Sequence, residues 1–339
     1  MEKRTLPGTD LQVSPLCLGC WQFNDSKSTI NWEGQTRETS KAIVDKCFDV
    51  GINFFDTAEG YAGSEEVLGY CLKGRRKDAV VATKYGFRSG PSTPPYSAAE
   101  IDEAVTRSLR KMETDYIDIL QIHFPSFVKD MNETLAELNS QIARGRIRHY
   151  GFSNFGPKNL KTYLDGGFKP VVNQMGYNLL WRSVEYEVQP ICAANDISVL
   201  AYSPLQQGLL TGKYSRLDDI PEGRRRGKLF CNKEGGENKL ARHGQEGAET
   251  EMFEAVNKLK GICERNKLDM AAASLAWVFQ QEAVPVAIVG ASTPEQIERN
   301  SKIIKLSPEI LKEMSDATQP VKDKIGKQLD QWASPDRCE

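Results

Sequence analysis

Short apolar segments rich in β-branched and aromatic residues recur along the chain, and amphipathic stretches separate them. Strands that are apolar throughout and alternate with helices predict a parallel sheet covered by helices. The segments that read as strands are 15–21, 52–56, 79–84, 117–123, 147–153, 170–175, 197–202 and 284–290. The stretches with helical periodicity are 36–50, 64–72, 97–112, 131–144, 157–164, 183–195 and 249–266.

Eight strand and helix units in 339 residues favour a single (β/α)8 TIM barrel over an open, doubly wound sheet. Pro7-Gly8-Thr9-Asp10 predicts the turn of a hairpin before the first barrel strand. Residues 206–247 carry little periodic apolar content and predict a long loop after the seventh strand, either a functional lid or a disordered excursion. We expect Ser64 to cap the helix that it begins. The barrel domain is predicted over 1–318, followed by a mobile polar tail over 319–339.

Composition narrows the range of partners. Lys and Arg (44) nearly balance Asp and Glu (46), so no strong charge points to nucleic acid or to a membrane surface, and a small-molecule ligand fits better. The eight cysteines are scattered without metal-ligand spacing, which predicts reduced thiols and no metal site. No segment resembles a signal peptide or a membrane span, so we expect a cytoplasmic monomer or weak oligomer.

Polar residues lie where the predicted strands end. In a parallel barrel these ends meet at one face, which carries the active site. Each residue has a plain structural alternative: Asp56 could cap a loop, Lys84 could be a solvated strand end, and His123 could be a buried histidine with satisfied hydrogen bonds. Together with nearby Tyr61 they predict an acid–base cluster. Other polar residues at strand ends are Ser153, Asn154, Asn173, Gln174, Tyr202 and Ser203.

Tyr61 is the predicted proton donor. A phenol has an ordinary pKa of about 10, so it is protonated at neutral pH but is a weak acid. An ammonium group beside it, Lys84, is expected to lower that pKa, and Asp56 is expected to orient the ammonium. His123 would hold the substrate oxygen in line with the phenol. The arrangement suits proton donation to a carbonyl oxygen that gains negative charge.

These residues lie in motifs that resemble the aldo-keto reductase superfamily over nearly the whole chain, from Leu16 to about Asn300. The motifs are NFFDTAEGYAGSEEVLG, VATKYG, DILQIHFP, GFSNF, NQ at 173 and 174, YSPLQQGLLTGKY and VGASTPEQIERN. The resemblance implies a barrel that binds a nicotinamide cofactor, usually NADPH, and reduces aldehydes or ketones. It also implies a catalytic tetrad of Asp56, Tyr61, Lys84 and His123.

The resemblance implies the cofactor site as well. Ser153, Asn154 and Gln174 would hold the carboxamide and Tyr202 would stack on the nicotinamide ring, while Lys213 would lie at the pyrophosphate. Arg299 and Gln296 depart from the common pattern near the adenosine, so NADH is a possible cofactor beside NADPH. The remaining implied cofactor residues are Cys20, Trp21, Ser203, Leu205, Gln207, Gly208, Gly290, Ser292, Thr293 and Asn300.

A mostly aromatic substrate pocket is predicted from Trp21, Tyr85 and Phe124, with Phe87 and Trp181 as further candidates. The leading hypothesis is an NADPH-dependent carbonyl reductase acting on a small carbonyl compound. One alternative is a cofactor-sensing regulatory subunit similar to the potassium-channel β subunits of the superfamily. The other is an NAD(P)-linked sugar dehydrogenase that uses the same residues for oxidation.

Overall fold

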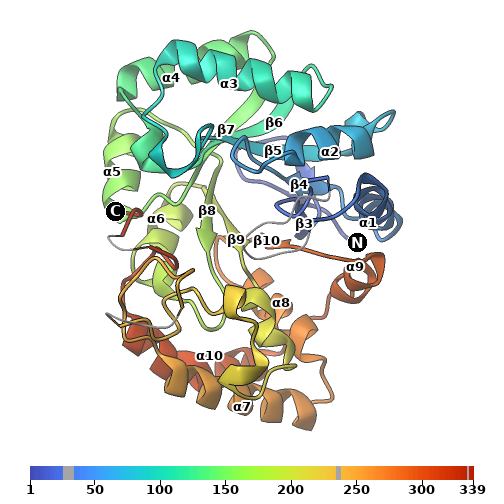
Figure 1. Cartoon of the computed structure of the whole chain (residues 1–339), viewed down its shortest axis with the longest axis vertical. Helices are drawn as coiled ribbons and strands as arrows, with labels where there is room; N and C mark the ends of the chain where they lie inside the picture. Colours follow the sequence, from blue (N-terminus) through green and yellow to red (C-terminus); the bar gives the residue numbers. More distant parts are fainter. Residues whose placement is uncertain (26–33, 234–237, 334–335) are drawn as a thin grey trace.

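Eight parallel strands close into a barrel in the computed structural model, which describes residues 1–25, 34–233, 238–333 and 336–339. Helices surround the barrel (Figure 1). The strand order is β10-β3-β4-β5-β6-β7-β8-β9, so the last strand in the sequence closes on the first, as the predicted (β/α)8 barrel requires. The strands are β3 Leu16–Gly19, β4 Phe54–Asp56, β5 Val80–Tyr85, β6 Ile117–Ile122, β7 Ile147–Ser153, β8 Val172–Gly176, β9 Ser198–Tyr202 and β10 Val286–Val289.

Side chains on the strands alternate between the barrel interior and the layer under the helices. On β5, Val80 and Ala82 belong to the interior cluster, so Lys84 is the next residue to point inward. Val81 and Tyr85 belong to the larger outer cluster. This alternation decides which residues at the strand ends reach the centre of the barrel.

The predicted amino-terminal hairpin is present and closes one end of the barrel. Its strands, β1 Arg4–Thr5 and β2 Gln12–Val13, pair antiparallel. The Leu6 amide donates to the Leu11 carbonyl across the turn. Leu6, Leu11 and Val13 are fully buried in the same cluster as the interior strand residues, so the hairpin seals the barrel floor.

Most helices begin and end within about two residues of their predicted limits. Thr36 caps α1 and Ser97 forms a capping box with Glu100 at the start of α3, which fixes these starts. The prediction for Ser64 was wrong: the cap is Gly63, and the Ser64 hydroxyl donates to the Cys20 carbonyl instead. The helices are α1 Arg37–Asp49, α2 Ser64–Leu72, α3 Ala98–Lys111, α4 Met131–Ala143, α5 Pro157–Asp165, α6 Val188–Ala194, α7 Glu249–Arg265, α8 Met270–Phe279, α9 Pro294–Asn300 and α10 Pro308–Ile325.

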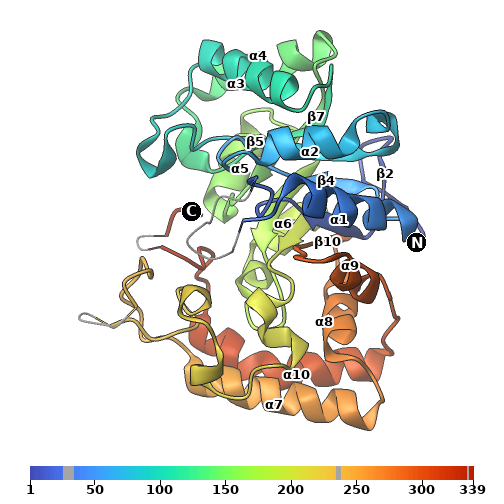
Figure 2. The same cartoon turned by 45° about the vertical axis from the view of Figure 1, so that its right-hand side comes forward.

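The segment after β9 and the C-terminal segment are more ordered than the loop and the tail that were predicted for them. The long segment after β9 contains three short 3-10 turns, and its residues 234–237 lie outside the described part of the chain. The expected boundary at residue 318 falls inside α10, which packs along α7 (Figures 1 and 2). Beyond α10, Leu329, Asp330 and Cys338 are buried, which corrects the prediction of a mobile tail.

None of the helices in the described part of the chain is both long and apolar enough to cross a membrane.

Candidate active site

The predicted tetrad comes together at the carboxyl ends of neighbouring strands. Asp56 ends β4, Lys84 lies on β5 and His123 follows β6. Tyr61 returns to the same place from the short turn before α2, because its amide donates to the Ala58 carbonyl at 3.0 Å. Four residues from three parts of the chain thereby share one buried site.

The Lys84 ammonium is the centre of this site. Its Nζ donates to Asp56 Oδ2 at 2.6 Å, to the Thr57 carbonyl at 2.9 Å and to the Tyr61 hydroxyl at 3.4 Å. The ring of His123 meets that of Tyr61 edge-on at 5.8 Å between centroids. Asp56 and Lys84 are almost completely buried, so low surrounding polarity strengthens these contacts.

Two glutamine side chains complete the hydrogen bonding of Asp56. Gln174 Nε2 donates to Asp56 Oδ1 at 2.7 Å and to Gln121 Oε1 at 3.2 Å. Gln121 Nε2 also donates to Asp56 Oδ1, at 3.2 Å. Sequence reasoning missed Gln121, although it lies two residues before His123 and therefore faces the interior with it. Gln174, predicted to hold the carboxamide, is bonded to the Asp56 carboxylate instead.

Burial and the charge on Lys84 set the protonation states. Burial raises the pKa of Tyr61, and although Lys84 acts to lower it, the pKa of the phenol stays above its ordinary value. The expected net lowering was therefore wrong. Burial acts to lower the pKa of Lys84, but Asp56 and Tyr61 outweigh it and raise that pKa. Burial, with help from Lys84, lowers the pKa of His123 well below its ordinary value, so the imidazole is neutral at pH 7.

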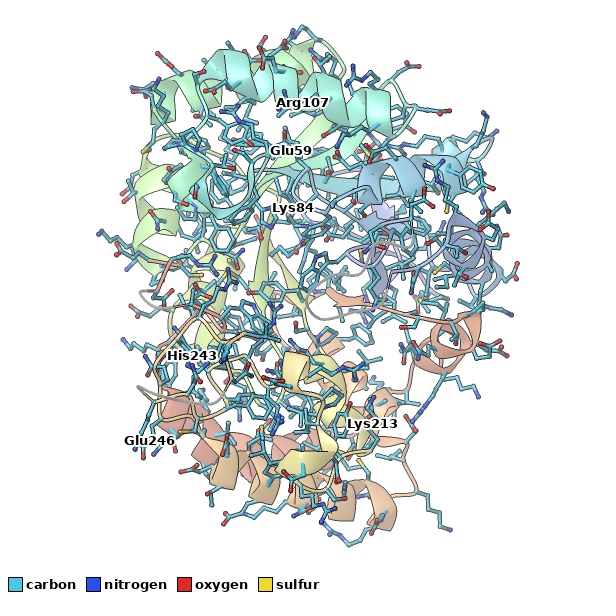
Figure 3. All side chains as sticks on the ribbon, viewed as in Figure 1. Glu59, Lys84, Arg107, Lys213, His243 and Glu246 are labelled. Carbon is cyan, nitrogen blue, oxygen red and sulfur yellow. The ribbon has the colours of Figure 1, made fainter. Side chains whose placement is uncertain are left out.

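Glu59 fixes the turn that carries Tyr61, a role that the sequence analysis did not assign. Its carboxylate accepts from the Gly86 amide at 3.1 Å, from the Tyr96 hydroxyl at 2.8 Å and from Arg107 at 2.7 Å. Arg107 reaches it from α3, on the side of Glu59 away from Lys84 (Figure 3). The Glu59 amide also donates to the Lys84 carbonyl, so the turn is tied both to β5 and to Gly86 just after it.

The predicted carboxamide residues lie beside the tetrad and bond to one another. Asn154 Nδ2 donates to the His123 carbonyl at 3.1 Å and to Ser153 Oγ at 3.1 Å. Tyr202 donates its hydroxyl to Asn154 Oδ1 at 3.1 Å. Asn154 has the positive φ of 61° that places its side chain over the strand ends. These amides and hydroxyls, with the flat ring of Tyr202, are the groups that a nicotinamide requires.

The segment from Leu205 to Lys213 has the backbone of a phosphate cradle. Gln207 and Gly208 adopt positive φ values of 53° and 95°, and the Gln207 Oε1 atom is buried without a partner among the described residues. A Cβ at Gly208 would lie 3.1 Å from the Lys213 ammonium, so the lysine folds closely over the glycine backbone. Lys213 is marked in Figure 3. Backbone amides of this shape beside an ammonium suit a pyrophosphate.

The residues predicted for the adenosine end lie at the start of α9. The Ser292 amide donates to Gln296 Oε1 at 2.8 Å, so this glutamine folds back over the loop. Arg299 forms a half-exposed ion pair with Asp269 at 2.8 Å. Among the described residues, only Gln22 Oε1 lies within 4 Å of a Cβ placed at Gly290. Thr293 caps the start of the helix, and Asn300 is its last residue. In this arrangement Arg299 already has an anionic partner.

The predicted substrate residues divide into two groups. Trp21 is 39% exposed with its ring 6.1 Å from that of Tyr61, and Phe124 stacks on His123 at 5.7 Å, so both line the barrel mouth. Phe87 meets His123 edge-on at 5.0 Å. The prediction for Tyr85 was wrong, because strand alternation turns it outward, where it packs on Tyr96.

Two further candidates are buried away from the mouth. Trp181 has no exposed surface and belongs to the outer cluster. Cys20, predicted to contact the cofactor, also has no exposed surface. Its amide donates to the Asp56 carbonyl and its own carbonyl accepts from Ser64, so its backbone groups are already used. Cys20 therefore supports the site from behind.

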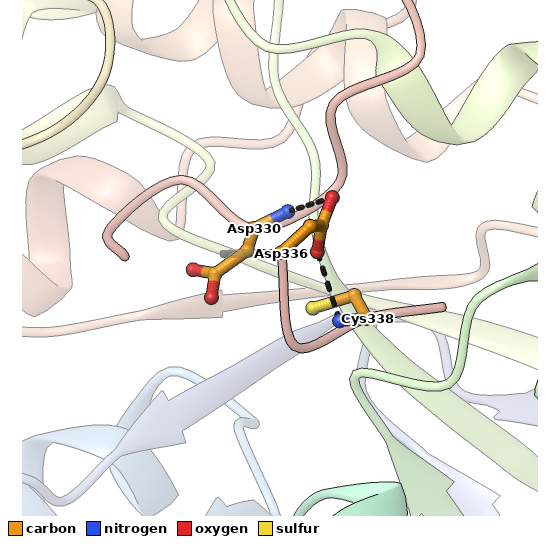
Figure 4. Close-up of side chains that lie close together, drawn as sticks. All are labelled: Asp330, Asp336 and Cys338. Atoms are coloured by element: carbon orange, nitrogen blue, oxygen red, sulfur yellow. Dashed lines mark hydrogen bonds between the residues drawn. The ribbon is translucent and has the colours of Figure 1, made fainter. Parts of the chain in front are cut away.

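One side-chain cluster has the composition of a metal site. Ligand atoms of Asp330, Asp336 and Cys338 lie within 4.8 Å of one another (Figure 4). Asp336 accepts backbone amides from Leu329 and Cys338, and Asp330 pairs with Arg337 at 2.6 Å. Both carboxylates therefore have a structural role, because their bonds hold the C-terminal segment in place.

The chain matches a family model over residues 15–318, and the model is that of the aldo/keto reductase family. The chain belongs to the aldo/keto reductase family. An NADH-specific methylglyoxal reductase of Escherichia coli is 31% identical over 94% of this chain and 99% of that protein. A putative voltage-gated potassium channel subunit beta of Schizosaccharomyces pombe is also 31% identical, over 92% of each chain.

Solved structures agree with this membership. A glycerol dehydrogenase of Gluconobacter oxydans superposes with a TM-score of 0.77 at 28% identity, over 93% of this chain and 94% of that one. An aldo-keto reductase of Bacillus halodurans in its holo form gives a TM-score of 0.74 at 26% identity over both whole chains. The chain is therefore an NAD(P)H-dependent oxidoreductase of the aldo/keto reductase family.

Proposed function

We propose that this aldo/keto reductase reduces aldehydes or ketones to alcohols with NADPH, and that Tyr61 protonates the carbonyl oxygen. The observation that carries the proposal is the buried chain of contacts from Asp56 through the Lys84 ammonium to the Tyr61 hydroxyl. A nicotinamide cofactor, when bound, would supply the hydride for the carbonyl carbon.

The residues of the site handle the proton and hold the substrate oxygen. Because the pKa of Tyr61 is raised, the phenol keeps its proton at neutral pH and releases it only as the oxygen gains negative charge. Lys84 stabilises the phenolate that is left, and Asp56 fixes the direction of the ammonium. Neutral His123 offers a hydrogen-bonding nitrogen to the same oxygen without adding a second positive charge.

The cofactor would lie across the mouth from Tyr202 to α9. Ser153, Asn154 and the ring of Tyr202 would hold the nicotinamide, and Lys213 with the amides around Gly208 would hold the pyrophosphate. Helix α9 has seven residues, and its Arg299 is paired with Asp269. NADPH is the proposed cofactor. NADH is the competing candidate, because the similar methylglyoxal reductase is named as NADH-specific.

A cofactor titration followed by a carbonyl screen tests the proposal. Quenching of protein fluorescence gives the dissociation constants of NADPH and NADH, and the proposal expects NADPH to bind at least about tenfold more tightly. Steady turnover of aldehydes should follow with the preferred cofactor. Equal affinities, or tighter binding of NADH, would overturn the cofactor assignment while leaving carbonyl reduction intact.

Tyr61→Phe tests the proton donor. The variant should lose at least about a thousandfold in kcat and retain the wild-type dissociation constant for NADPH, because the hydroxyl acts only on the substrate oxygen. Asn154→Ala serves as the contrasting variant, since it should weaken cofactor binding. Near wild-type reduction of a model aldehyde by Tyr61→Phe would remove the phenol from the mechanism.

A second candidate function rests on the likeness to the yeast protein named as a putative channel β subunit. In that case cofactor binding would serve a regulatory complex, and turnover would be limited by slow cofactor release. Rapid-mixing kinetics distinguish the two functions, because a regulatory subunit shows one fast turnover and then almost none, whereas an enzyme shows steady turnover. Preferred oxidation of sugars or polyols in the same assay would reverse the proposed direction.

A further inference from the structure

We propose that Arg226 and Arg242 bind an anionic group of the substrate, so that the enzyme selects carbonyl compounds that carry a carboxylate or a phosphate. This inference rests on the proposed carbonyl reduction and names the substrate class for the same site.

Two segments bring arginines to the barrel mouth. Arg226 and Arg242 lie in the long segment after β9, and Arg337 lies in the C-terminal segment after α10. The two segments are joined by a β-bridge between Arg242 and Ala333 and by a hydrogen bond from the Lys228 amide to the Gln331 carbonyl at 2.8 Å. Figure 2 shows these segments beside each other at one edge of the barrel.

The side chains of Arg226 and Arg337 are each one aromatic ring away from the tetrad. The Arg226 guanidinium carbon lies 5.6 Å from the ring centre of Trp21 and 5.0 Å from that of Trp332. Arg337 lies 4.5 Å over the ring of Phe124, which stacks on His123. Stacking on aromatic faces fixes the planes of these guanidinium groups. Arg337 already donates to Asp330, whereas the N–H edge of Arg226 is left to hydrogen-bond a ligand.

Positive charge here exceeds negative charge among the described residues. Arg337 has a carboxylate partner, Asp330, at 2.6 Å. In the part of the chain that the structure describes, no carboxylate pairs with Arg226 or Arg242, and Arg226 Nε is buried without a hydrogen-bond partner. Burial, with the neighbouring charge of Arg242, lowers the pKa of Arg226 to about 10, as expected for a guanidinium whose charge is not balanced.

The geometry sets the form of the ligand. A planar guanidinium matches carboxylate and phosphate oxygens, and a pair of them favours an anion over a neutral hydroxyl. Trp21 separates Arg226 from Tyr61, so the anionic group would be separated from the reacting carbonyl by a short carbon chain. The pyrophosphate cradle has its own cation in Lys213, which leaves the arginines at the mouth for the substrate.

Matched pairs of aldehydes test the proposal on the cofactor-loaded enzyme. One pair is 4-oxobutanoate and its methyl ester, and the other is glyceraldehyde 3-phosphate and glyceraldehyde. The wild type should show at least about tenfold higher kcat/KM for the anionic member of one pair, as a hydrogen bond to a charged group implies. The pair with the larger ratio identifies carboxylate or phosphate as the preferred group. Added salt should reduce this ratio.

Arg226→Gln should reduce the ratio of kcat/KM for the anionic substrate to that for the neutral substrate by about tenfold or more. Arg242→Gln, at an exposed position, should also reduce this ratio. The matched control is Arg216→Gln, which removes one charge from the same segment where Arg216 pairs with Asp219 at 3.2 Å. It should leave the ratio unchanged.

Three outcomes overturn the proposal. They are equal use of both members of each pair by the wild type, an unchanged ratio in both variants, and a loss that is equal for the anionic and neutral substrates. If no aldehyde of either kind is reduced, the proposed function has failed as well. Reduction of the neutral aldehydes without an anion preference would refute this inference alone.

Discussion

At the scale of single residues, the site depends on a lysine with no exposed side-chain surface whose charge is balanced by one carboxylate. Lys84 and Asp56 lie 2.6 Å apart, and both are buried. Removing one member of such a pair leaves the other charge unpaired in a low-polarity interior, which costs about 3–5 kcal/mol. The contacts that we propose for catalysis are therefore also structural contacts.

Lys84→Met should lower the free energy of unfolding by about 3–5 kcal/mol and abolish turnover, because Asp56 loses its cation and Tyr61 loses the group that stabilises its phenolate. Urea denaturation and steady-state kinetics measure the two effects. The double variant Asp56→Asn/Lys84→Met should recover much of the stability and none of the turnover. Recovery of turnover in the double variant would contradict the role given to Lys84.

Glu59 is expected to act as a positioning residue. Glu59→Gln weakens the bond to Arg107 that holds the turn before Tyr61, and small displacements of a catalytic group cost up to about a hundredfold in rate. We expect kcat to fall by about tenfold or more, with KM and the dissociation constant of the cofactor nearly unchanged.

Glu103→Gln is the control for this prediction, because Glu103 lies 3.6 Å from the same Arg107 but is mostly exposed. It should behave as the wild type, since exposed pairs contribute little. If kcat fell equally in Glu59→Gln and Glu103→Gln, Glu59 would support Arg107 and not the turn before Tyr61. Rescue of kcat by Glu59→Asp would strengthen the positioning role.

The same alternation of side chains explains which residues could be found from the sequence. Lys84 and His123 were recognisable because charged or titratable residues are rare on buried strands. Tyr85 was misplaced because it follows Lys84 directly and therefore points to the opposite face. Gln121 is an ordinary polar residue in an apolar run, and only the barrel register, which pairs Lys84 with Gln121, reveals its contact with Asp56.

At the scale of secondary-structure elements, periodicity found the barrel strands and most of the helices but missed α8, α9 and α10. All residues of α8 except one are buried, so it lacks the polar face that marks a surface helix. Helix α10 was not predicted, and the tail was placed from residue 319 because the last turns of this helix are polar and contain Pro320. The C-terminal segment beyond it is held by specific bonds, such as that of Asp330 to Arg337, which no periodic pattern reports.

The contact between α2 and α3 gives a prediction at this scale. A Cβ at Gly69 on α2 would lie 2.7 Å from backbone atoms of Met112, which caps α3. Gly69→Ala should therefore push the helices apart and lower the free energy of unfolding by about 1–3 kcal/mol, although alanine favours helix. Chemical denaturation measures this loss.

Gly261→Ala is the matched substitution in α7. The nearest atom to a Cβ there is the flexible Arg265 side chain at 3.4 Å, so only the helix preference remains. It should raise the free energy of unfolding by about 0.5–1 kcal/mol. Stabilisation by both substitutions would show that α2 and α3 can separate without cost, contrary to the close approach at Met112.

At the scale of the whole molecule, charge is unevenly distributed. The chain has a formal net charge of −2, yet the described part of the barrel mouth is covered by segments that carry Arg226, Arg242 and Arg337. A small net charge gives little long-range attraction for an anion, so discrimination must come from the guanidinium groups at the mouth. This is why the salt dependence should appear in the use of anionic substrates.

Buried histidines make the stability of the whole molecule depend on pH. Burial lowers the pKa of His123 well below 6.5, and burial also lowers the pKa of His243. In the unfolded chain each histidine takes up a proton near pH 6.5, while the folded protein keeps His123 neutral. Below pH 6.5 the unfolded state therefore binds more protons, and the free energy of unfolding falls as the pH falls.

We expect the free energy of unfolding to fall as the pH is lowered from 7.5 to 5.5. Below pH 6.5 the fall due to His123 should approach about 1.4 kcal/mol per pH unit, and His243 should add a smaller loss in the same direction. Urea denaturation at closely spaced pH values measures it. The carboxylate of Glu100, with a pKa of about 2, contributes only at lower pH, where its stabilisation is lost as pH falls from about 4.5. His123→Asn should flatten the curve between pH 6.5 and 5.5, and an unchanged slope in that variant would mean that another group takes up the proton.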